Sequence, residues 1–271
     1  MATTATLQPA LPADIRLMNA TAAVLATLGV IALVATGLLW FVRQPMFALH
    51  TIRVEGDLAH NSALTIRANA APRMAGNFFT MDLAATRRAF ESVPWVRQAI
   101  VRRVWPDTLS VRLEEHRPVA LWSRPDNASD GSDKLVNSFG EVFEANLGDV
   151  EDEGLPTLRG PDGMSNRMLH LWAALQPVVA GLEAQIDTLE LSGRGSWRAE
   201  LDSGAEIEFG RGSDDEVIER ARRFVGTVTQ VTQRYQRPIE YADLRHNEGY
   251  AVRLKGVSTA LEVAPGKAQK K

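Results

Sequence analysis

The sequence predicts an α+β protein with a single transmembrane helix, a small domain after it, and a mixed β domain with flanking helices. Residues 20–42 carry no charged side chain. Beyond them, apolar residues at helical spacing alternate with strand-like, period-two segments. Residues 47–124 hold 11 arginines and 7 acidic residues, a net charge of +4, whereas residues 125–256 hold 14 basic and 24 acidic residues, a net charge of −10. This asymmetry favours two domains, although two differently charged surfaces would also explain it.

The segment 20–42 is expected to anchor the chain in a membrane. At about 1.5 Å per residue it reaches roughly 35 Å, which exceeds a hydrocarbon core of roughly 30 Å. Eleven of its residues are Val, Leu, Ile or Phe. A buried core helix would be shorter and amphipathic, and a cleaved signal peptide would end in small residues, whereas this run ends in Leu-Leu-Trp-Phe-Val-Arg. Residues 1–19 form an Ala/Thr/Pro-rich tail, expected to be disordered and cytoplasmic, since a short tail before a large body favours an N-in, C-out topology.

Residues 46–116 are expected to form the first domain, in the order strand, helix, helix, strand, strand. Asn61 is a candidate N-cap for a first helix that is broken at Pro72, and a second helix begins near Asp82 and ends at Pro94. Trp105-Pro106-Asp107 is a turn between two strands. The predicted strands are 47–54, 96–104 and 109–114.

Residues 117–256 are expected to form the second domain. A hairpin is predicted over 135–143, and further strands at 196–202, 205–210, 239–244 and 250–254. Ser213 and Glu216 match the S-x-x-E capping box that opens a helix. Two helical stripes are predicted to be core: Met168, Trp172, Leu175, Val179 and Leu182, interrupted by Pro177, and Val217, Ala221, Phe224, Val228 and Val231. Residues 257–271 are small and basic, and disorder is expected there.

The sequence does not predict an enzyme. With no cysteine, it excludes disulfides, Cys-ligated zinc, iron–sulfur clusters and thiol catalysis. The histidines lack metal-ligand spacing, and no Walker loop, G-x-S-x-G, S-x-x-K or H-E-x-x-H motif occurs. We therefore expect no catalytic residue, metal or cofactor, and neither a nucleic-acid nor a small-molecule partner. The strand with Arg97, Arg102 and Arg103 could contact lipid phosphate.

Several segments together resemble the FtsQ/DivIB family of bacterial division proteins. They are FALHTIRVEG (47–56), VPWVRQAIVRRVWPDTLSVRLEEHRPVALW (93–122), LVNSFGEVF (135–143), LPTLRGP (155–161) and YADLRHNEGYAV (241–252). The resemblance implies that 47–116 is a POTRA-like domain and that 117–256 is the family's β domain. It also implies a non-enzymatic scaffold of the inner membrane, with a cytoplasmic N-terminus and a periplasmic body. Such a scaffold would bind FtsB and FtsL at the division septum and control septal peptidoglycan synthesis.

The last predicted strand, Tyr250 to Lys255, has no later element with which to pair. At a sheet edge its free N–H and C=O groups could template a partner strand. The resemblance carries the FtsB-binding role onto Arg245, His246, Glu248, Gly249, Tyr250 and Leu254. Arg245 would pair with a partner carboxylate, while Tyr250 and Leu254 would supply apolar contact. His246 and Leu254 replace a tyrosine and a tryptophan common in relatives, so backbone pairing is the safer inference. On the residues alone, Arg253 and Lys255 could simply guard a solvated edge against aggregation.

Two other functions remain open on the residues. A POTRA-containing factor for protein export or outer-membrane assembly would carry a β-barrel or several tandem POTRA units, whereas one unit follows the apolar helix here. A membrane-tethered cell-wall hydrolase would need paired carboxylates, a Ser/Lys pair or metal ligands in a cleft, and none stands out.

Overall fold

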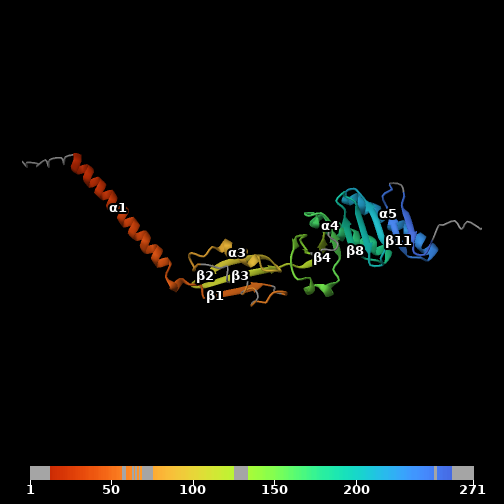
Figure 1. Cartoon of the computed structure of the whole chain (residues 1–271), viewed down its shortest axis with the longest axis horizontal. Coiled ribbons are helices and arrows are strands. Elements are labelled where there is room, and N and C mark those ends of the chain that lie inside the picture. Colours follow the sequence, from red (N-terminus) through yellow and green to blue (C-terminus); the bar gives the residue numbers. More distant parts are fainter. Residues whose placement is uncertain are drawn as a thin grey trace, which may run out of the picture. The chain divides into compact units, whose positions relative to one another are not determined.

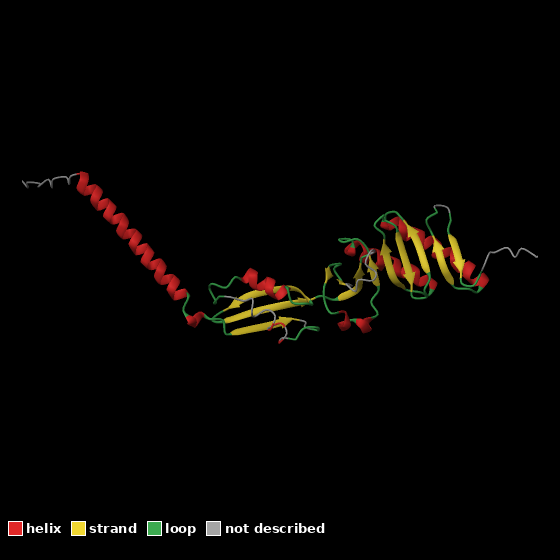
Figure 2. Ribbon diagram, viewed as in Figure 1, coloured by secondary structure: helices red, strands yellow, loops and turns green. Residues whose placement is uncertain are grey.

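The computed structural model describes residues 13–56, 59–62, 64, 66, 68, 76–124, 134–246 and 249–257 (Figures 1 and 2). The predicted disorder of 258–271 and most of the helix predicted after Asn61 lie outside these residues. The chain divides into two compact units, one ending at Glu114 and the other beginning at Glu115. The predicted fold class is confirmed: an apolar helix, a small sheet with a helix, and a mixed sheet with helices follow one another along the chain.

Helix α1 spans Ala13–Val42, so it begins seven residues before the predicted anchor, and the end of the predicted tail is helical. Within its segment Leu17–Val42, the most apolar 18 residues have a mean hydropathy of 2.4 and none of them is buried in the protein, so the helix is long and apolar enough to cross a membrane. The hydroxyls of Thr21, Thr27 and Thr36 donate to backbone carbonyls one turn earlier, at 2.8–3.1 Å. These bonds satisfy the polar groups that a lipid environment would leave without partners.

The first domain is a three-stranded sheet in the order β1-β3-β2, with β1 parallel to β3. The strands are β1 (Thr51–Gly56), β2 (Val96–Val104) and β3 (Thr108–Glu115). Helix α3 (Leu83–Glu91) packs on β2 and is capped by Asp82, which accepts bonds from the N–H groups of Ala84 and Ala85. The hydrophobic core of this first domain includes Ile66, Phe90, Leu109 and Val111.

The first predicted strand begins later than expected. Phe47 lies in a 3-10 turn, η1 (Pro45–Phe47), and not in a strand. Pro45 has a fixed φ, and its carbonyl accepts a bond from the Ala48 N–H, which closes the turn. The chain becomes extended enough for strand pairing only from Thr51.

The second domain is built on a nine-stranded sheet in the order β12-β11-β10-β9-β8-β7-β4-β5-β6. Its strands are β4 (Pro118–Ser123), β5 (Lys134–Asn137), β6 (Val142–Phe143), β7 (Thr157–Arg159), β8 (Ile186–Leu191), β9 (Trp197–Leu201), β10 (Glu206–Gly210), β11 (Ile239–Asp243) and β12 (Ala251–Leu254). The parallel pairs are β4–β7, β7–β8 and β10–β11. Sequence analysis did not predict β4, β7 or β8.

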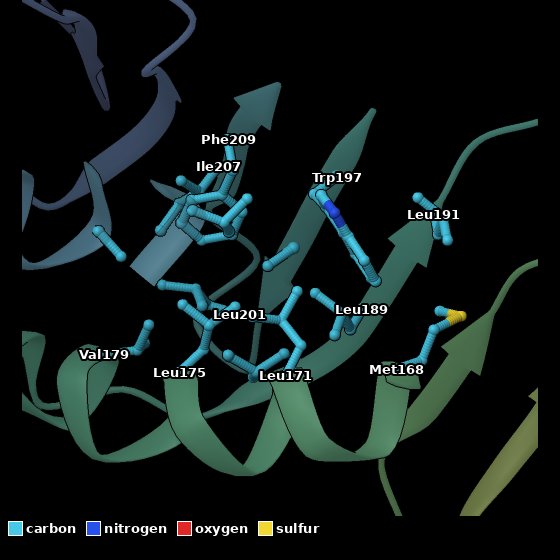
Figure 3. Packing of buried hydrophobic residues seen from close by; sticks show 14 of the residues in the cluster. Met168, Leu171, Leu175, Val179, Leu189, Leu191, Trp197, Leu201, Ile207 and Phe209 are labelled. Atoms are coloured by element: carbon cyan, nitrogen blue, oxygen red, sulfur yellow. The ribbon is translucent and has the colours of Figure 1, made fainter. Parts of the chain in front are cut away.

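Helices α4 (Ser165–Val179) and α5 (Asp214–Tyr235) pack against each other and against this sheet. Figure 3 shows Met168, Leu171, Leu175 and Val179 of α4 facing the sheet residues Leu189, Trp197 and Leu201. From α5, four of the five predicted core residues are buried, and Val231 is half-buried. Short 3-10 turns occur at η3 (Leu147–Asp149), η4 (Glu151–Glu153) and η5 (Ala180–Leu182).

Pro177 does not interrupt α4, which continues to Val179. A proline removes one intrahelical bond and clashes with the preceding turn. Here only two residues of α4 follow Pro177, and the chain then changes to the 3-10 turn η5, which begins at Ala180. Leu182 therefore lies in η5 and not on the helix. The capping box at the start of α5 is present as predicted: Ser213 and Glu216 exchange side chain-to-backbone bonds.

Candidate partner-binding edge

Strand β12 is an edge strand. Among the strands that the structure describes, its single neighbour is β11, with which it pairs antiparallel from Asp243↔Ala251 to Ile239↔Leu254. The other side of β12 therefore carries backbone groups without a partner in the described sheet. An edge strand with such backbone N–H and C=O groups can pair with one more strand.

The register indicates which N–H groups face outward. The Lys255 N–H donates to the Pro238 carbonyl at 2.9 Å, so it points toward β11. N–H directions alternate along a strand, and the irregularity between Ile239 and Tyr241 lies on β11 and not on β12. The N–H of Arg253 therefore faces β11, whereas the N–H groups of Val252 and Leu254 face the open edge.

The predicted site residue Arg245 is held by Asp243, at the end of β11. Arg245 Nε lies 2.8 Å from Asp243 Oδ1, and Arg245 Nη2 lies 2.6 Å from Asp243 Oδ2. The backbone N–H of Arg245 also donates to Oδ1, at 3.0 Å. These bonds lower the pKa of Asp243 to about 2, even though its burial opposes ionisation. The same contacts raise the pKa of Arg245, whose side chain is 56% exposed.

The other predicted site residues differ in their exposure. His246 and Gly249 are exposed, whereas Tyr250 is half-buried, with its ring edge-on to Phe224 at 5.0 Å between centroids. Leu254 is buried, so its side chain faces its own domain. Glu248 lies outside the described residues. His246, Gly249 and Tyr250 line a hollow of about 310 Å³ that reaches Phe224 and Leu244.

A second, larger hollow of about 840 Å³ lies beside Arg245, and sequence reasoning missed it. Its charged lining is mostly basic and consists of Arg194, Arg211, Arg220, Arg223, Arg245, Asp215, Glu216 and Glu219. The guanidinium of Arg220 donates to the backbone carbonyls of Phe209 and Arg211. The five arginines are spread over some fifty residues of an acidic segment, so neither spacing nor net charge signals them.

The β12 edge offers backbone groups for pairing, and the larger hollow offers cationic side chains. Within the described ranges, no group of three or more His, Asp or Glu side chains could hold a metal ion. An open edge of this kind can pair with an extended chain, and arginine side chains can bind carboxylates.

A curated relative, the cell division protein FtsQ of Burkholderia pseudomallei, is 39% identical over 255 residues, covering 94% of this chain and 98% of the relative. The chain belongs to the FtsQ/DivIB family. The FtsQ-type POTRA domain matches residues 47–116, and the C-terminal region of the cell division proteins FtsQ/DivIB matches residues 120–245.

Further FtsQ relatives cover most of the chain. The protein of Thiomonas arsenitoxydans is 38% identical, covering 91% of this chain and 90% of its own, and that of Bordetella pertussis is 36% identical, covering 89% and 92%. The three-stranded domain is thus an FtsQ-type POTRA domain, and with α1 the chain is a membrane-anchored member of this cell-division family. The family match to the C-terminal region ends at Arg245, so β12 lies beyond it.

Proposed function

We propose that this chain is a non-enzymatic, bitopic scaffold of the bacterial divisome that binds FtsB and FtsL. It links cytoplasmic and periplasmic division proteins and thereby controls septal peptidoglycan synthesis. The single observation that carries this proposal is the open edge at β12, in a chain of the FtsQ/DivIB family.

The proposed docking mode is addition of one FtsB strand to β12. The outward N–H groups of Val252 and Leu254 would pair with its backbone. Arg253, one of the two guard residues of the alternative interpretation, lies back over its own sheet, 3.4 Å from Glu240 and over the Tyr241 ring at 5.4 Å. Its charge is thus engaged with β11, which leaves the edge free for backbone pairing.

Side chains around the edge would add specificity. Arg245 lines the larger hollow and its side chain is 56% exposed, so an acidic side chain of FtsB can approach it while Asp243 holds its orientation. Tyr250 offers an apolar ring beside the smaller hollow. Because Leu254 is buried, we assign it a backbone role and not a side-chain contact.

The decisive experiment uses the full-length chain in lipid nanodiscs and a purified FtsB–FtsL complex. Val252→Pro removes one outward N–H, while Val252→Thr keeps the N–H and the branched shape. We expect the proline variant to lose binding and the threonine variant to retain it, with equal thermal unfolding. Wild-type affinity in a folded Val252→Pro protein would rule out strand addition. Ala251→Pro is a different control, since that N–H faces β11 and its loss should destabilise the sheet itself.

The orientation of the chain in the membrane can be tested by labelling an introduced cysteine. Because the native chain has no cysteine, the introduced thiol is the single site that can react. Ser203→Cys places a single thiol in the exposed turn between β9 and β10. A membrane-impermeant maleimide should label it in intact cells whose outer membrane has been permeabilised. Labelling that appears only after lysis would place the body in the cytoplasm. A fluorescent fusion that forms a band at midcell would support septal enrichment, and a uniform envelope signal would oppose it.

A further inference from the structure

An aromatic cluster joins the end of α1 to the POTRA domain. The buried ring of Phe47 contacts Phe41 in the last turn of α1, with 5.4 Å between ring centroids. The same ring meets Phe79 at 5.0 Å and Trp105, from the β2–β3 turn, at 6.5 Å. Three segments distant in sequence thus converge on one residue, five positions beyond Val42.

The outer side of this cluster is an exposed apolar patch. We define the juxtamembrane patch as Met46, Phe79, Val104 and Trp105, which are 68%, 46%, 44% and 64% exposed. These four residues lie outside the main core of the domain, although Phe79 and Trp105 also pack on the Phe47 ring. Phe79 and Trp105 meet on the Phe47 ring, and Met46 and Val104 adjoin Phe47 and Trp105 in the sequence. Exposed apolar groups that lie together usually mark a surface that binds another molecule.

Chain connectivity places the patch close to the membrane. Phe47 is five residues from the end of α1, a distance of at most about 17 Å for a fully extended chain. Here the connection is shorter, because Asn77 Nδ2 donates to the Val42 carbonyl at 2.6 Å, and the Phe78 N–H donates to the Phe47 carbonyl at 2.9 Å. The first bond satisfies a carbonyl that the end of α1 would otherwise leave open.

The residue types suit the interface between lipid and water. Tryptophan favours the headgroup level, where its apolar ring and its polar N–H are both satisfied. Trp40 and Phe41, in the last turn of α1, are also exposed and extend the set of aromatic side chains near the juxtamembrane patch. Arg43 follows α1 directly, and Arg102 lies on β2 two residues before Val104; both are exposed and can reach lipid phosphate.

We propose that the juxtamembrane patch inserts into the headgroup region of the leaflet where α1 ends, so that the POTRA domain is held against the bilayer surface. The occupant of the patch is thus lipid. Connectivity argues for it, because the patch remains within reach of the bilayer whatever partners the second domain binds. The inference depends on α1 crossing the membrane and is independent of strand addition at β12.

The test exploits the absence of cysteine in the native chain. Phe79→Cys and Trp105→Cys are each labelled with an environment-sensitive fluorophore in the full-length protein. The matched control is Arg112→Cys, on an exposed site of β3 some 13 Å along the strand from Thr108. Each protein is placed in nanodiscs of phosphatidylcholine and phosphatidylglycerol, with and without lipids that carry a nitroxide at the headgroup or the upper acyl chain.

We expect both patch labels to be quenched several-fold more strongly than the control label and to emit at shorter wavelength. Equal, weak quenching at positions 79, 105 and 112 would overturn the proposal, because the patch would then face water. Circular dichroism of each labelled protein checks that it has folded. The two patch positions lie on different loops. If one variant does not fold, the quenching of the label in the other variant still tests the proposal.

Discussion

Arg245 and Asp243 form a two-bond ion pair in which Nε and Nη2 of the arginine each bind a different carboxylate oxygen, at 2.8 and 2.6 Å. The aspartate is buried and its partner is exposed, so the pair connects the end of the sheet to its surface. This arrangement orients the guanidinium at the end of β11, where the Arg245 side chain lies against Gly210 of β10.

The pair predicts acid sensitivity. The pKa of Asp243 falls from an ordinary 3.8 to about 2 in the folded chain, so the ionised form stabilises the fold above pH 4. This stabilisation, up to about 2 kcal/mol, is lost as the pH falls from about 4 to about 2. Asp243→Asn should therefore lower the unfolding free energy at pH 7 and flatten its dependence on pH in that window. Urea titrations of the full-length chain in detergent would show this, and an unchanged acid profile would contradict it.

Arg245→Lys keeps a positive charge but cannot form the same fork of bonds to Asp243. We expect it to weaken FtsB–FtsL binding by about tenfold, or about 1.4 kcal/mol, because the cation loses its fixed orientation. Biolayer interferometry on nanodiscs measures the change. Arg234→Lys, in the last turn of α5, is the matched control and should bind as the wild type does. Equal affinities in both variants would remove Arg245 from the site.

Ser213→Ala should destabilise the second domain by about 1 kcal/mol, because the Glu216 N–H loses its acceptor at the start of α5. Ser203→Ala, in the exposed β9–β10 turn, should change stability very little. Denaturant midpoints of the two variants, followed by tryptophan emission, decide the matter. Identical midpoints would show that the capping box contributes nothing.

Gly140 and Gly163 provide a matched pair of positive-φ glycines, at +78° and +81°. An alanine Cβ at 140 would lie 2.5 Å from Asn166 Cα, whereas at 163 nothing lies within 4 Å. Both substitutions carry backbone strain, and Gly140→Ala adds an overpacking cost of about 1–3 kcal/mol. We expect the melting temperature to fall further for Gly140→Ala; a larger loss for Gly163→Ala would refute this explanation.

Locally encoded elements could be predicted from the sequence. The strand Thr108–Glu115 alternates apolar and polar residues directly after a Pro-containing turn, and Ser213 with Glu216 marks the start of α5 within the chain itself. The terminal strands β11 and β12 have clear patterns on either side of a Gly-containing loop.

Elements that depend on distant partners could not be predicted. Strand β7 has three residues, and it exists because β4 and β8 pair with it in parallel on its two sides. Strand β4 begins at a proline and lacks simple alternation, since Trp122 and Ser123 are both buried. At the candidate site, Arg245 was found by resemblance, but its neighbours Arg194 and Arg220 come from separate elements that meet only in the folded chain.

The two ends of the nine-stranded sheet are unequal. Strand β6, at the end opposite β12, has two residues in the described structure, too few to template another chain. The nine-stranded sheet would therefore accept one guest strand and offer, among its described strands, no second long edge from which a ladder could continue. Assembly through this sheet would stop at a fixed stoichiometry, and the fold would protect itself against open-ended fibre growth.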